Sequence, residues 1–237
     1  MNFIRPEWPA PERVKSLITT RIGGVSLPPY GSLNLGNHVG DDPEHVLENR
    51  RRLKAHLPSE PAWLGQVHGR SVVNLDGQES REGDGAYTKR PNVVCAILTA
   101  DCLPVLFAGK NSVGAAHAGW RGLAAGILEE TANAMGDVET AYLGPAIGQA
   151  AFEVGEEVLD AFPGETSAFR KGKEGRWHAD LYKIARIRLE TIGIREIHGG
   201  NYCTHDEASR FFSYRRDGKT GRMGSFIWIE EPRTYII

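Results

Sequence analysis

The segment VVCAILTADCLPVLFAGKNSVGAAHAG, residues 93–119, places three apolar runs in succession with only a few residues between them. Each run is typical of a strand, and the breaks contain the Gly, Pro, Asn and Asp of turns. A parallel pair of strands needs a crossover of about a dozen residues, so strands joined this closely pair mainly in antiparallel or mixed order. The segment therefore favours a mixed or antiparallel sheet over an all-parallel one.

The rest of the chain alternates similar runs with helical segments. Strands are predicted over 15–21, 62–67, 71–75, 140–144, 195–199, 211–215 and 224–230. Helices are predicted over 41–57, 122–136, 152–162 and 180–193, with Asp42 and Asp180 as N-caps and Pro43 at a first helical position. We therefore expect an α+β fold in one domain spanning 1–237, a mixed sheet or sandwich with helices on the outside.

The composition limits the classes of partner. A chain of 237 residues, 41% of them hydrophobic, can bury a substantial core. Its net charge of −2 argues against nucleic acid or a membrane surface as a partner, and no apolar stretch is long enough to span a membrane. Three cysteines without a CxxC pair, and an N-terminus without an apolar signal region, favour a cytoplasmic protein.

The common enzyme motifs are absent. The chain has no GxGxxG, GxxxxGK[ST], GxSxG or HExxH, and it has no PCxxC, so the zinc deaminase signature of HxE with PCxxC is missing. These absences argue against dinucleotide, P-loop and serine-hydrolase chemistry. They leave chemistry built from residues that are distant in sequence.

Three residues suited to metal binding lie at breaks in the strand pattern. Cys102 lies between two predicted strands, His68 follows the run 62–67, and His117 lies near the end of 112–118. Two imidazoles and a thiolate form a zinc ligand set that leaves a fourth position for water. The spacing is not diagnostic, because the same pattern also fits two loop histidines and a core cysteine.

Further polar residues are candidates for a nearby site. Asp101 would be costly to bury without a partner, and it could either orient a metal-bound histidine or cap a turn. Asp84, in REGDGAYT, is typical of turn chemistry. Arg21 and Arg50 lie near turns and could bind phosphate, although a surface role fits each of them as well.

Six stretches together resemble the YfiH-type laccase-domain family of bacterial proteins. They are TTRIGGVSLPPYGSLNLGNHVGDDPEHVLENRRRL, WLGQVHG, TADCLPVLF, AAHAGWRGL, YLGPAIGQAAFEVGEEV and FFSYRRDGKTGRMGSFIWI. They occur in order from about residue 18 to 230, so the resemblance covers nearly the whole chain.

The resemblance implies a single-domain α/β/β/α sandwich and a metal site. The ligands would be the histidine of QVHG, the cysteine of ADCLP and the histidine of HAGW, here His68, Cys102 and His117. Members are described as polyphenol oxidases, as editors of peptidoglycan precursors, and as enzymes that phosphorolyse adenosine, inosine, guanosine and methylthioadenosine and deaminate adenosine. Eight histidines without any HxH argue against a laccase with several copper centres, so zinc is expected, with copper as the alternative metal.

We therefore predict a zinc-dependent purine nucleoside phosphorylase with adenosine deaminase activity, monomeric or homodimeric, acting on nucleosides and phosphate. Asp84 or Asp101 is the candidate proton carrier for deamination. Arg21 or Arg50 is the candidate phosphate clamp.

Two other functions stay open. A Cys–His hydrolase would use Cys102 as the nucleophile and His117 as the base, and it would leave His68 without a role. A binding protein would hold metal and nucleoside without turnover.

Overall fold

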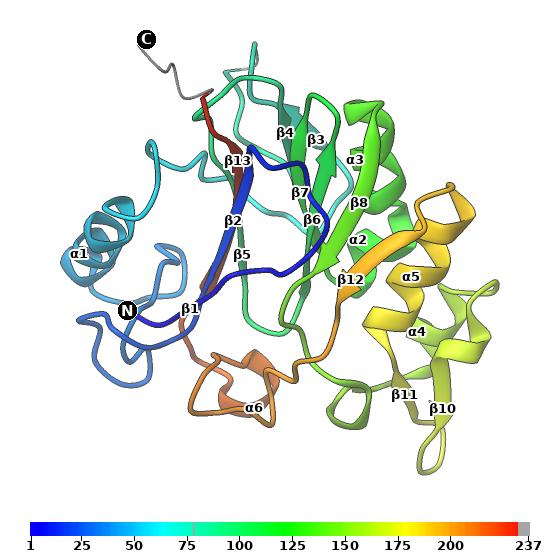
Figure 1. The fold of residues 1–237 in the computed structure, drawn as a ribbon. Helices are drawn as coiled ribbons and strands as arrows, with labels where there is room; N and C mark the ends of the chain where they lie inside the picture. The colour runs from blue at the N-terminus through cyan, green and yellow to red at the C-terminus, as the bar shows by residue number, and fades with distance from the viewer. Residues whose placement is uncertain (78, 232–237) are drawn as a thin grey trace, which may run out of the picture.

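The chain folds into two β-sheets that face one another and carry helices on their outer sides (Figure 1). The structure, a computed structural model, describes residues 1–77 and 79–231. Its sheets are largely antiparallel, so the predicted single-domain α/β/β/α sandwich is confirmed. Within the described residues, no helix is long and apolar enough to cross a membrane.

One sheet has four strands and is antiparallel throughout. In spatial order its strands are β1 (Phe3–Ile4), β2 (Val14–Thr19), β13 (Met223–Ile229) and β5 (Cys95–Thr99).

The facing sheet has six strands, of which the two outermost pair in parallel with their neighbours. In spatial order its strands are β12 (Glu196–Gly199), β8 (Val138–Leu143), β6 (Leu103–Gly109), β7 (Val113–Ala118), β4 (Gly85–Thr88) and β3 (Val72–Asn74). A small third sheet contains β10 (Phe169–Lys171), β11 (Trp177–Ala179) and β9 (Glu153–Val154).

The helices flank these sheets. They are α1 (Pro43–Lys54), α2 (Trp120–Ala125), α3 (Ile127–Met135), α4 (Glu156–Asp160), α5 (Leu181–Thr191) and α6 (Tyr214–Asp217), with the 3-10 turns η1 (Gln149–Ala151) and η2 (Thr166–Ala168). Both predicted caps are confirmed, since the side chain of Asp42 accepts a hydrogen bond from the N–H of Glu44, and that of Asp180 accepts one from Lys183.

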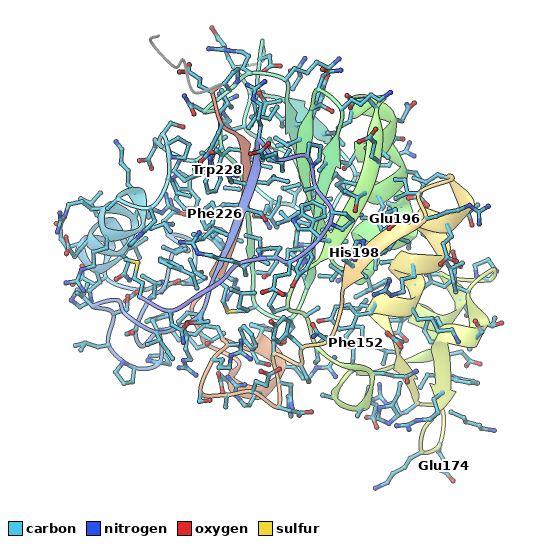
Figure 2. All side chains as sticks on the ribbon, viewed as in Figure 1. Phe152, Glu174, Glu196, His198, Phe226 and Trp228 are labelled. Atoms are coloured by element: carbon cyan, nitrogen blue, oxygen red, sulfur yellow. The ribbon has the colours of Figure 1, made fainter. Side chains whose placement is uncertain are left out.

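Three apolar clusters hold the layers together. Side chains such as Ile97 of β5 and Leu106 of β6 fill the space between the two large sheets. Residues of α2, α3 and α5 cover the outer face of the six-stranded sheet. On the opposite side, Leu53 of α1 packs with Phe226 and Trp228, which Figure 2 labels on β13. The central strands β5, β6, β7 and β13 thus alternate their side chains between two apolar layers, as expected for strands covered on both faces.

Several predicted elements are corrected by the structure. The helix expected over 122–136 is two helices, because Gly126 adopts φ 92° and ends α2. The helix expected over 152–162 is shortened to α4 by the strand β9. The runs 62–67 and 211–215 form no strand; the first makes only isolated bridges, and the second leads into α6.

The three strands of residues 93–119 do not form one sheet. β6 and β7 pair as an antiparallel hairpin, but β5 pairs with β13 in the facing sheet. The chain therefore changes sheets between Thr99 and Leu103, and Asp101 adopts φ 91° in that crossing. A short connection that leaves one layer for another needs a sharp bend, which explains the break in the apolar run.

Candidate metal centre

Cys102 lies at the crossing between the sheets, immediately before β6. The backbone carbonyl of the preceding Asp101 accepts a hydrogen bond from Ile147 (3.0 Å), which ties the crossing to the segment after β8. The thiol is therefore held on a short, well-anchored bend, and its residue is half-buried.

His117 is the penultimate residue of β7 and is buried. On this strand Val113 and Ala115 face the layer between the sheets, so the alternation of side chains places His117 on the same face. Its Nδ1 lies 2.8 Å from Oδ1 of Asp84, a carboxylate with no exposed surface. Nδ1–H donates to this carboxylate, so Nε2 is the ring nitrogen that would bind a metal after losing its proton.

His68 lies in a loop rather than at the end of a strand. The side-chain amide of Gln66 donates to the carbonyl of Leu98 (2.8 Å) and accepts from its N–H (2.8 Å), which holds this loop against β5. The carboxylate of Asp84 accepts from the N–H groups of Val67, His68 and Gly69 at 3.2, 2.9 and 2.7 Å. These bonds hold His68 at φ 63°, a conformation that few non-glycine residues adopt.

The three side chains converge on one point. The ligand atoms of His68, Cys102 and His117 all lie within 4.8 Å of one another, and Sγ of Cys102 is 4.0 Å from Nε2 of His68. The imidazole rings meet edge to face with centroids 4.7 Å apart. A Cβ at Gly119 would lie 2.9 Å from Sγ, so only glycine leaves room for the thiol there.

Electrostatics favour an ionised Cys102. Burial alone would raise the pKa of its thiol, but His117 and His68 outweigh burial and lower it to about 6. Burial likewise opposes the charged form of His117, yet Cys102 and Asp84 raise its pKa to about 9. The pKa of Asp84 stays below its ordinary value because His117 and backbone N–H groups outweigh the effect of burial.

The donor set fits a bound metal ion. Two imidazoles and a thiolate are the nitrogen and sulfur ligands that zinc prefers, and three protein ligands leave a position for water or substrate. Asp84 completes the arrangement, because a carboxylate on the remote nitrogen of a ligating histidine orients the ring and raises its basicity. The site could hold one metal ion, and that ion would act as a Lewis acid.

The other predicted site residues have different surroundings. The carboxylate of Asp101 accepts from Oγ1 of Thr204 (2.6 Å), Oγ of Ser213 (3.0 Å) and the N–H of Arg215 (2.6 Å). Asp101 therefore anchors the segment around α6. The carboxylate that orients a histidine of the site, His117, is Asp84.

The two predicted phosphate ligands bond elsewhere. Arg21 donates to the carbonyls of Gly31 (2.9 Å) and Ala208 (3.0 Å), and Arg50 donates to that of Leu35 (2.8 Å from Nη2). Neither is among the residues that line the cavity at the metal centre.

That cavity has a volume of about 450 Å³ and opens beside His68 and Cys102. Its apolar walls are Trp120, Ile147, Phe152 and Leu181, and its polar side chains include His38, Tyr214, Arg215 and Arg222. Phe152, labelled in Figure 2 in the region below β12, lies 5.3 Å from the Arg215 guanidinium. Neither Arg215 nor Arg222 is among the predicted site residues, although the cation-rich stretch SYRRDGKTGR was a usable signal.

The chain matches a known family model over most of its length. Residues 15–230 match the model described as multi-copper polyphenol oxidoreductase laccase.

Curated relatives cover the chain almost completely. It is 53% identical to a protein of Escherichia coli strain K12 named purine nucleoside phosphorylase YfiH, over 96% of this chain and 99% of that one. A Pseudomonas aeruginosa protein, also named a purine nucleoside phosphorylase, is 49% identical over 97% of this chain and 99% of its own.

Solved structures share the fold. A Neisseria meningitidis protein superposes with a TM-score of 0.91 at 48% identity, covering 98% of this chain and 100% of that one. YlmD of Geobacillus stearothermophilus superposes with a TM-score of 0.88 at 34% identity, covering 98% and 97%.

Proposed function

The chain belongs to the family described as multi-copper polyphenol oxidoreductase laccase, and we propose that it is a zinc-dependent purine nucleoside phosphorylase. The observation that carries this proposal is the convergence of His68, Cys102 and His117 beside one cavity of mixed apolar and cationic lining. The names of its curated relatives support enzyme status. We also propose a cytoplasmic location, which the three free cysteines favour.

The proposed substrates are adenosine, inosine, guanosine and methylthioadenosine, with deamination of adenosine as a second activity. The apolar walls, which include Trp120 and Phe152, offer a surface on which a purine ring can stack. A bound zinc ion would supply a Lewis acid and a water with a pKa of about 7.

The protein's own residues have defined tasks. Cys102 and the two histidines provide the ligand atoms, and Asp84 keeps Nε2 of His117 directed at the site. Asp84 accepts four hydrogen bonds and Asp101 accepts three, so both carboxylates hold surrounding segments in place. Asp84 and Asp101 stay the proposed proton carriers for deamination, and His38, which lines the same cavity as Asp101, is a further candidate.

Copper chemistry of the laccase type is a poorer fit. A multi-copper oxidase requires several metal centres, and within residues 1–77 and 79–231 one group of His, Cys, Asp or Glu side chains is placed to hold a metal. A single copper ion at the same three ligands remains the alternative occupant.

A specific observation favours a second candidate, a thiol hydrolase. The pKa of the Cys102 thiol is lowered chiefly by the adjacent His117, which is the pairing of an activated thiolate with a histidine base. Such an enzyme could act on a peptidoglycan precursor at the same site without metal.

In the deciding experiment, purified protein of known metal content is incubated with adenosine and phosphate, and the formation of ribose 1-phosphate, purine base and inosine is measured. We expect Cys102→Ala and His68→Ala to lose both metal and turnover, whereas His45→Ala on α1 changes neither. Full turnover in variants that have lost their metal would refute the zinc mechanism. Dependence on Cys102 alone, in protein that never binds metal, would establish the hydrolase instead.

A further inference from the structure

A second pocket adjoins the cavity of the metal centre. Its volume is about 390 Å³, and it shares His38, Tyr214 and Arg222 with that cavity. The remaining lining comes from Val39 and from the segment Gly218–Thr220, which follows α6. The two pockets therefore share one wall, so a molecule in one lies next to a molecule in the other.

The lining of this second pocket is cationic. Its cations are Lys219 and Arg222, and no acidic residue lies among its described lining. Arg222 donates through Nη1 to the carbonyls of Thr220 and Gly221, both at 3.0 Å, which fixes its guanidinium at the shared wall. Lys219 is exposed, and its Nζ lies 5.6 Å from the centre of the Tyr30 ring.

Thr220 gives a separate sign of a missing ligand. The residue lines the pocket and is only 1% exposed, yet its hydroxyl oxygen has no hydrogen-bond partner. Buried hydroxyl groups almost always have a partner, because burying one unpaired is costly. A ligand oxygen that reaches this hydroxyl from the pocket would supply the missing partner.

His38 contributes an imidazole rather than a charge to the pocket. Burial first, then the charges of Arg222 and Arg50, lower the pKa of its imidazole below the ordinary value. An anion bound here would meet the fixed positive charges of Arg222 and Lys219.

We propose that this pocket, formed by His38, Lys219, Thr220 and Arg222, binds the inorganic phosphate that the proposed phosphorolysis consumes. The catalytic role of this pocket rests on the proposed function, whereas phosphate binding to the pocket can be measured independently of that function. Arg222 belongs to both pockets and positions the phosphate beside the nucleoside. The base then occupies the apolar cavity, and the ribose lies between the two.

The reaction balances with these two substrates alone. An oxygen of HPO₄²⁻ forms a bond to C1′ of the ribose while the bond from C1′ to the purine nitrogen breaks. The electron pair of that bond goes to the purine nitrogen, which takes up the proton that the phosphate loses. The products are ribose 1-phosphate and the free base.

The test measures orthophosphate binding by calorimetry and the KM for phosphate. Thr220→Val exchanges the unpartnered hydroxyl for a methyl group and breaks no bond within the protein. Lys219→Met removes a charge from the pocket, and Lys110→Met removes the same charge elsewhere. Since a hydrogen bond to a charged group contributes about 1.5–3 kcal/mol, we expect Lys219→Met to weaken phosphate binding roughly tenfold or more.

The expected pattern is a raised phosphate Kd and KM in Lys219→Met and Thr220→Val, with an unchanged KM for nucleoside, and no change in Lys110→Met. Phosphorolysis with an unaltered phosphate KM in both pocket variants overturns the subsite and leaves the proposed function standing. If phosphate binding depends on Lys219 and Thr220 but the protein carries out no phosphorolysis, the phosphate subsite stands and the proposed function is refuted. Tight binding of a nucleoside 5′-monophosphate through these residues, without binding of orthophosphate, also overturns the proposal.

Discussion

Asp84 and His117 form a buried pair in which the carboxylate lies 2.8 Å from Nδ1 of the imidazole. The same carboxylate accepts three backbone N–H groups of the loop that carries His68. One side chain thus orients two of the three proposed metal ligands, one through its ring and the other through its backbone. Such outer contacts control metal affinity nearly as strongly as the ligands themselves.

Asp84→Asn should weaken metal binding about 10- to 100-fold, because the amide is a poorer acceptor for Nδ1–H and for the loop. A chelator competition titration measures the affinity. Asp160→Asn, at the exposed end of α4, is the matched control and should bind metal normally. An unchanged affinity in Asp84→Asn would mean that the carboxylate does not orient the site.

Gly119→Ala should lower the metal content while the fold persists. The added Cβ would lie 2.9 Å from Sγ of Cys102 and 3.4 Å from a ring carbon of His68, so the thiol must move. Gly164→Ala is the control, since a Cβ there meets nothing within 4 Å. Metal analysis together with circular dichroism tests this. Full metal occupancy in Gly119→Ala would contradict the crowded geometry.

The metal-free protein should alkylate at Cys102 with a half-maximal rate near pH 6. The thiolate reacts, and its population rises as pH rises through the pKa that His117 and His68 lower to about 6. Rates of iodoacetamide labelling between pH 4 and about 9 measure this in a Cys203→Ser background. Cys95 stays inert, because it is fully buried and burial raises the pKa of its thiol.

His117→Ala supplies the check on that assignment. Without the imidazolium, the midpoint for Cys102 should move upward toward the ordinary thiol value. A midpoint that stays near pH 6 in this variant would show that His117 is not what lowers the pKa.

Asp101→Asn should destabilise the fold by about 1.5–3 kcal/mol, because three donors converge on a carboxylate that the amide only partly replaces. Urea unfolding measures the free energy of unfolding. Asp160→Asn again serves as the control and should change it by less than about 0.5 kcal/mol. A neutral Asp101→Asn would indicate that the segment around α6 is held by other contacts.

The strands of residues 93–119 show which structural features a local sequence pattern can predict. Their length and turn residues correctly predicted β5, β6 and β7, and close succession correctly predicted antiparallel pairing for β6 and β7. That β5 belongs to the facing sheet could not be predicted, because pairing with β13 depends on residues more than a hundred positions away. Local periodicity carries no information about such partners.

The features of the candidate site likewise fall into those that the sequence predicts and those that only the tertiary structure decides. The sequence by itself determined the ligand types, the breaks at which Cys102 and His117 lie, and the caps of α1 and α5. Only the tertiary structure brings the three ligand atoms within 4.8 Å, gives Asp84 rather than Asp101 the orienting contact, and places Arg222 rather than Arg21 or Arg50 at the cavity. The physical reason is that hydrogen bonding and burial depend on distance in space, and folding brings together groups that the sequence keeps far apart.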